Sequence, residues 1–178
     1  QIKNNIENIE GVLSVSPVVK GQVMANANGQ NQGVEVFGET LIDIKKLPLI
    51  MSPELSYGSI DSFEKGIAIG SGIARSLGLK LGDTLTLISP DGVKTAFGTS
   101  PRINGFEVVY IFQVGRYDID NTRIYMPLAE AQIYFNSEGR VDEFEVIVNE
   151  PEDIDDLKIL LLSSMSNSAL IWTWRDAN

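Results

Sequence analysis

The two ends of the chain show hydrophobic patterns that alternate between helix and strand. Ile2, Ile6 and Ile9 recur at helical spacing and predict an amphipathic helix that Gly11 ends. A strand interrupted at Pro17 is expected from Val12 to Met24. In the last third we expect a strand, a helix with a buried apolar stripe and a closing strand, in the order Phe144 to Val148, Ile154 to Met165 and Ala169 to Trp174.

The middle of the chain is richer in short strands and turn residues. A polar loop from Asn26 to Gly33 leads into a strand from Val34 to Phe37, and an irregular stretch follows from Leu41 to Phe63. Alternation then predicts further strands, and Pro127 suits the first turn of a helix that runs to Phe135. These strands are Thr84 to Ser89, Phe106 to Val114 and Arg123 to Met126.

These elements predict an α+β fold built as a split lobe with an insertion. Residues 1–46 and 141–178 would form an α/β lobe from both chain ends. Residues 47–140 would form an inserted, β-rich lobe. A protruding hairpin is expected within that insertion, at about residues 90–102.

Glycines at residues 66–82 raise the question of a nucleotide-binding loop. Gly70-Ser71-Gly72 resembles the start of a dinucleotide fingerprint, but Arg75 stands where the third glycine belongs. A structural explanation is favoured, in which Ser71 caps a helix that Gly78 ends. Ile69, Ile73 and Leu77 would form its buried face.

Composition narrows the function classes. The chain has 178 residues, 43% of them hydrophobic, and its net charge of −10 with a pI near 4.4 disfavours nucleic acid and anionic lipid as partners. It contains no cysteine and no histidine, which excludes disulfides, thiolate or imidazole metal sites and the commonest general base. We therefore expect that the chain is not an enzyme and that it binds no metal and no cofactor. No apolar run is long enough to span a bilayer, and the start at Gln1 is expected of an excised domain.

Three further groups of residues have a functional and a structural interpretation. Asp118 and Asp120 could attract calcium, but the loop lacks the spacing of a calcium loop, so a solvated turn is favoured. Glu143 and Glu145 would share one strand face, where exposure to solvent is favoured over a paired-carboxylate site. Trp172 and Trp174 would share another face, either in the core, which is favoured, or in an interfacial belt.

Several motifs in the middle of the chain, in this order and spacing, resemble a known family. Gly66 to Gly70, Leu77-Gly78 and Gly82-Asp83 are similar to the MacB-type periplasmic core domain superfamily of ABC transporters. The continuation resembles its lipoprotein-releasing permeases, of the LolC/LolE type. The matching segments are Thr95 to Arg102, Phe106-Glu107-Val108, Ile111-Phe112, Gly115 to Asp118, Met126-Pro127-Leu128, Ala131-Gln132 and Trp174 to Asn178.

The resemblance implies a location, partners and a two-lobed fold. Such a permease would lie in the bacterial inner membrane, with this domain on the periplasmic side, divided into a porter-like lobe and an inserted Sabre lobe. It would release acylated lipoproteins and pass them to a soluble LolA-like periplasmic carrier. The implied partners are this carrier, the lipoprotein, a second permease subunit of the same or a sister type, and a cytoplasmic ATPase subunit that hydrolyses the ATP.

The resemblance also implies a carrier-binding site. The family's carrier-binding hairpin, the Hook, would correspond to Asp91 to Ser100. A neighbouring polar Pad would include Arg102, with Thr86 and Pro101 at other Pad positions, where neither can make the charge-assisted contacts of an arginine. The Hook residues assigned to carrier binding are Thr95, Ala96, Phe97, Gly98 and Thr99.

The residues also point to a binding hairpin without the family. Phe97 lies in a polar stretch between two turn-forming segments, and an aromatic at a hairpin tip is a natural anchor for a partner's groove. Alternatively, Phe97 folds back onto its own lobe and the hairpin is only a connector. Two other functions stay open: a MacB-like exporter core that transmits motion to an adaptor or peptide substrate, and a hydrolase or ligand-binding domain.

Overall fold

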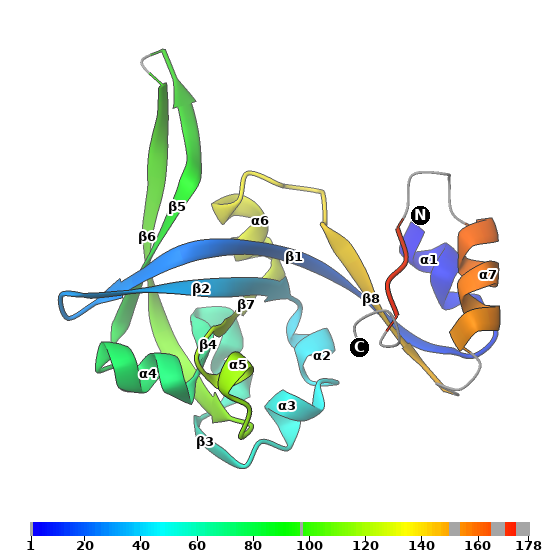
Figure 1. The fold of residues 1–178 in the computed structure, drawn as a ribbon, viewed down its shortest axis with the longest axis horizontal. Helices are drawn as coiled ribbons and strands as arrows, with labels where there is room; N and C mark the ends of the chain where they lie inside the picture. The colour runs from blue at the N-terminus through cyan, green and yellow to red at the C-terminus, as the bar shows by residue number, and fades with distance from the viewer. Residues whose placement is uncertain (1, 97, 150–153, 165–169, 174–178) are drawn as a thin grey trace. The chain divides into compact units, whose positions relative to one another are not determined.

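The computed structural model describes residues 2–96, 98–149, 154–164 and 170–173 and shows an α+β chain, as predicted (Figure 1). Its helices are α1 (Ile2–Glu7), α2 (Leu41–Ile44), α3 (Pro48–Met51), the 3-10 helix η1 (Ile60–Lys65), α4 (Ser71–Leu77), α5 (Tyr117–Asp120), α6 (Leu128–Tyr134) and α7 (Ile154–Ser164). Its strands are β1 (Val12–Ala27), β2 (Gln30–Glu39), β3 (Leu55–Gly58), β4 (Ile67–Gly70), β5 (Thr84–Thr95), β6 (Gly98–Gln113), β7 (Arg123–Pro127) and β8 (Glu143–Val148).

The chain divides into two compact units. Unit 1 combines both chain ends, Gln1–Pro17 and Glu143–Asn178, and unit 2 is the insertion, Val18–Asp142. The first boundary differs from the predicted position 46, because β1 continues through Pro17 without interruption and its second half pairs with β2 and β5. Residues 18–46 therefore belong to the inserted unit, because the strands among them pair within it.

Unit 2 is organised by strand pairings that close on themselves. β1 pairs antiparallel with β2, β2 pairs parallel with β7, and β7 pairs antiparallel with β4. β4 then pairs parallel with β6, β6 antiparallel with β5, and β5 antiparallel with β1, which completes the ring. β3 adds to β6 outside this ring.

Alternation along the strands directs one set of side chains into the ring. Leu85 and Leu87 of β5 are fully buried, whereas Thr86 between them and Ile88 after them are only half-buried. The buried set forms the main core together with one face of α4 and of α6, including Ile73, Leu77 and Tyr134. A second core, around Phe63, Phe112 and Tyr125, packs beneath α2, α3, α5 and η1.

The glycines that resembled a nucleotide loop serve close packing. A Cβ added at Gly70 would collide with the backbone of Asp120, and one added at Gly72 would collide with the side chain of Asn121. The predicted cap at Ser71 is wrong: Gly70 occupies the N-cap position and Ser71 is the first residue of α4, where its hydroxyl donates to Gln113 at 3.4 Å. Gly78 ends α4 in the left-handed conformation, as predicted.

Unit 1 has its own small core. β8 pairs with β1, and Ile6, Val15 and Leu161 are buried between these strands and the helices α1 and α7. The predicted closing strand is not observed over Leu170 to Thr173, the part of it that the structure describes. Without strand pairing to direct it inward, Trp172 is 78% exposed rather than part of the core, and Trp174 lies outside the described residues. No helix in the described ranges is long and apolar enough to cross a membrane.

The tip of the β1–β2 hairpin holds the end of α4. Asn28 adopts a positive φ of 50°, which asparagine tolerates better than most residues. Its side-chain amide donates to the carbonyls of Leu77 and Gly78 at 2.8 and 3.1 Å. These carbonyls have no partner within the helix, so one side chain caps α4 and fixes it to the ring.

We predict that Asn28→Ala lowers the free energy of unfolding by about 1–2 kcal/mol, because it removes the two cap bonds and places alanine at positive φ. Urea denaturation followed by circular dichroism measures this loss. Asn28→Gly keeps the turn conformation and loses only the bonds, so its loss should be smaller. Equal stability of wild type and Asn28→Ala would contradict the capping role.

Candidate functional site

The predicted hairpin is present as the outer part of the β5–β6 ladder. It projects from the rest of unit 2 in Figure 1. Thr95 pairs with Gly98 at the end of the ladder, and the Thr95 hydroxyl donates to the Gly98 carbonyl at 2.7 Å. Ala96, Gly98, Thr99 and Thr95 are exposed, while Phe97 lies outside the described residues.

A break in register separates this outer part from the ring. Ser89 pairs with Arg102 and Val93 pairs with Ser100, so β5 carries two extra residues at this point. Pro90 and Pro101 lie at the break. Because proline has no backbone N–H, neither donates a hydrogen bond to the ladder. Gly92 is required there because an added Cβ would collide with the Ser100 carbonyl. The break therefore sets the base from which the hairpin departs.

Arg102 holds this base to the end of α6. Its guanidinium donates to the Ile133 carbonyl and to the Asn136 side-chain oxygen. Arginine at the end of a helix satisfies free carbonyls and is favoured by the helix dipole. The Tyr134 ring beside it is buried, and burial raises the pKa of that phenol to about 12 against the opposing effect of the Arg102 charge.

The predicted Pad residues lie on opposite faces of the β5–β6 ladder. Thr86 and Pro101 belong to the outer face, where Thr86 is half-buried and Pro101 lines a cavity. Arg102 follows Pro101 and points to α6 instead, as strand alternation requires. The structure thus brings the hairpin residues together at one end but does not join Arg102 to Thr86.

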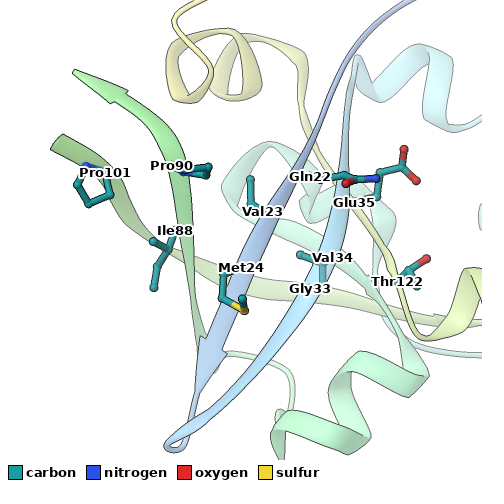
Figure 2. A pocket seen from close by; sticks show the side chains of 10 residues that line it. All are labelled: Gln22, Val23, Met24, Gly33, Val34, Glu35, Ile88, Pro90, Pro101 and Thr122. Carbon is teal, nitrogen blue, oxygen red and sulfur yellow. The ribbon is translucent and has the colours of Figure 1, made fainter. Parts of the chain in front are cut away.

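The cavity on the outer face has a volume of about 760 Å³. Figure 2 shows Pro90, Pro101 and Ile88 toward one end, Met24 between, and Gln22, Glu35 and Thr122 toward the other. Pro101 was predicted as a Pad position, and none of the residues of β1 and β2 that line this cavity was predicted as a site residue. Met24 and Ile88 are apolar, yet each alternates with buried neighbours and so points away from the core. Apolar residues at such positions were the signal that could have indicated this face.

The acidic pair in α5 has a structural explanation. Asp120 is buried, and its carboxylate accepts from the backbone amides of Val114 and Gly115 at 2.9 and 3.1 Å. Asp118 is exposed and pairs with Arg116 at 2.9 Å, whose hydrogen bond lowers the pKa of that carboxyl below its ordinary value. Within the described ranges, no group of three or more acidic side chains is placed to hold a metal ion.

The acidic pair in β8 is also structural. Glu143 and Glu145 occupy alternate positions of the strand and are exposed. This confirms the expected solvent-facing strand surface and leaves the hairpin and the adjoining outer face as the candidate site.

Solved structures of other proteins share this fold. The extracellular domain of the noncanonical ABC-type transporter YknZ from Gram-positive bacteria superposes with a TM-score of 0.57 at 17% identity, covering 91% of this chain and 81% of that one. The periplasmic region of MacB from Actinobacillus actinomycetemcomitans gives a TM-score of 0.57 at 12% identity, with 91% and 72% covered. The chain therefore shares the fold of these two domains.

Sequence comparison identifies the family. Residues 1–161 match the family described as MacB-like periplasmic core domain, and the chain belongs to this family. LolC of the lipoprotein-releasing system of Neisseria meningitidis serogroup B is 25% identical over 177 residues, which are 97% of this chain and 42% of that protein. LolC of Xylella fastidiosa is 30% identical over 93 residues, 51% and 22% of the two chains. The chain thus spans less than half the length of these relatives. A periplasmic core domain of this family is a non-catalytic part of an ABC transporter permease.

We predict that Arg102→Ala costs about 1–2 kcal/mol of stability, because two hydrogen bonds from a charged group to the end of α6 are lost. Arg102→Lys should recover only part of this, since an ammonium group cannot reproduce the fork that reaches both acceptors. Thermal and urea unfolding of the three proteins measure the difference. Indistinguishable stability of wild type and Arg102→Ala would show that the contact with α6 is unimportant.

Proposed function

We propose that this chain is the periplasmic domain of a lipoprotein-releasing permease and that it docks a soluble lipoprotein carrier through the β5–β6 hairpin. The LolC names of its relatives support the lipoprotein-releasing function. The observation that carries the docking role is the hairpin itself. Thr95, Ala96, Thr99 and Ser100 are exposed beyond the last ring pairing, so they are available to a partner.

The proposed docking surface consists of the Hook residues with Thr86 and Pro101 at their base. Phe97, which stands between Ala96 and Gly98 in the sequence, remains the proposed apolar anchor. Arg102 is proposed to act by positioning the hairpin, because its guanidinium is engaged by α6. The ladder that ends at the Thr95–Gly98 pair would present these groups with little loss of conformational freedom on binding.

The wider assembly follows from the same proposal. The full-length protein would pair with a second permease subunit, of the same or a sister type, and with a cytoplasmic ATPase that supplies the energy. This domain would couple that motion to transfer of the acylated lipoprotein to the carrier. Its own role is to bind and to transmit force.

Hydrogen bonds within unit 2, joined by the chain between Arg140 and Asp142, offer a route for such coupling. From Arg102 the contacts pass to Asn136, whose carbonyl accepts from Arg140 at 3.0 Å. Asp142 then bonds β1: its carboxylate accepts from the Lys20 amide at 2.8 Å, and its amide donates to the Val18 carbonyl. The next residue along the chain begins β8. Displacement of the strand β8 would therefore be transmitted to the base of the hairpin.

We predict that Ala96→Arg weakens binding of the purified carrier from the same bacterium by about tenfold or more, because it places a bulky charge at the tip. Ala129→Arg is the matched control, since Ala129 is also exposed but lies on α6. Isothermal titration calorimetry on both variants and on Phe97→Glu measures the effect.

Undiminished carrier binding by both Ala96→Arg and Phe97→Glu would contradict the docking role of the hairpin. Absence of carrier binding by the wild-type domain, together with cross-linking of the hairpin to an adaptor protein in cells, would instead favour the MacB-like exporter function.

A further inference from the structure

The outer face of the ring carries an apolar surface that the hairpin does not account for. Met24 of β1 lies opposite Ile88 of β5 on one side and Gly33 of β2 on the other. Ile88 in turn lies opposite Ile103 of β6, which is 60% exposed. Met24 is 43% exposed, although its strand is paired on both sides at this position. Cross-strand neighbours of this kind form one contiguous apolar row.

The strand β2 leaves room above this row. Gly33 has ordinary backbone geometry, and an added Cβ would meet no atom within 4 Å. The cavity of about 760 Å³ lies here, with Met24, Gly33 and Ile88 among its lining residues. This surface, which we call the outer groove, is therefore an open hollow with an apolar floor (Figure 2).

The outer groove continues directly into the base of the hairpin. Pro90 and Pro101, which flank the register break, line its end nearest the hairpin. A partner that grips the hairpin from this side would therefore lie over Ile88 and Met24. Because the two surfaces are continuous, the partner that we propose for the hairpin is the occupant that this groove suits best.

The opposite end of the outer groove is polar and contains one carboxylate, that of Glu35. The half-buried Glu35 lines it beside Gln22, and the ion pairs found among the described residues do not include Glu35. Arg123 lies opposite Glu35 in the β2–β7 register, but its guanidinium is stacked on the Phe37 ring at 4.5 Å. With a net charge of −10 on the chain, this end favours a cationic group on the partner.

We propose that the outer groove is a second contact surface for the lipoprotein carrier, one that receives an apolar side chain over Met24 and Ile88 and a lysine or arginine at Glu35. This inference rests on the proposed function, because it takes the carrier as the occupant. It extends the docking surface from the hairpin to β1 and β2. The carrier is then held at two places, which orients it relative to the ring.

The test uses the chain as it stands and the purified carrier from the same bacterium, with affinities measured by isothermal titration calorimetry. Met24→Glu is expected to weaken binding by about tenfold, and Met51→Glu, at a methionine that is 50% exposed on α3, is the matched control with little effect. Gly33→Leu fills the outer groove from its open wall and should weaken binding similarly without disturbing the fold.

Charge is tested separately. Glu35→Lys should weaken binding and remove part of its salt dependence, whereas Glu64→Lys, at an exposed position of η1, should not. Circular dichroism and thermal unfolding verify that each variant is folded.

The outcomes separate this inference from the proposed function. Loss of affinity in Met24→Glu and Gly33→Leu, with Met51→Glu unchanged, supports the outer groove as a contact surface. Full affinity of both groove variants while Ala96→Arg binds poorly overturns the outer groove and leaves the hairpin's docking role intact. Full affinity of all three variants overturns both.

Discussion

The pairing of β5 with β6 is the interaction on which the rest of unit 2 depends. From Thr84 to Ser89 this ladder closes the ring, because β6 continues to β4 and β5 to β1. From Val93 to Thr95 the same two strands leave the ring as a hairpin. The register break between these parts, with Pro90, Pro101 and the obligatory Gly92, allows one ladder to serve both purposes. The stability of the ring thus supports the hairpin.

The same ladder separates two kinds of residue by its faces. One face directs Leu85 and Leu87 into the core and Arg102 toward α6, where it fixes the hairpin base. The other face presents Ile88 and Pro101 to solvent beside Met24. The contacts that support the hairpin and the surface that we propose for recognition therefore lie on opposite sides of the same two strands. A binding element that is rigid at its base loses less conformational entropy when it meets its partner.

Local patterns in the sequence predicted the strands from Thr84 and Arg123, the helix after Pro127 and the extent of the hairpin, because alternation and turn residues act over short distances. They failed where tertiary contacts decide. Ser71 was expected to cap a helix and instead begins it, while Trp172 was expected in the core and is exposed. The contact of Arg102 with Asn136 joins residues far apart in the chain, so no local pattern could reveal it. The outer groove likewise needs the β1–β5 register, which the sequence does not specify.

The central claim is that the carrier binds the hairpin and the adjoining outer groove. Titration of isotope-labelled domain with unlabelled carrier, followed by NMR of backbone amides and of Met and Ile methyl groups, tests it most directly. The account predicts shifts at Thr95 to Thr99 and at the Met24 and Ile88 methyl groups, with the exposed Met51 and Ile159 unchanged. Shifts confined to α7 and β8, with the hairpin unaffected, would contradict it.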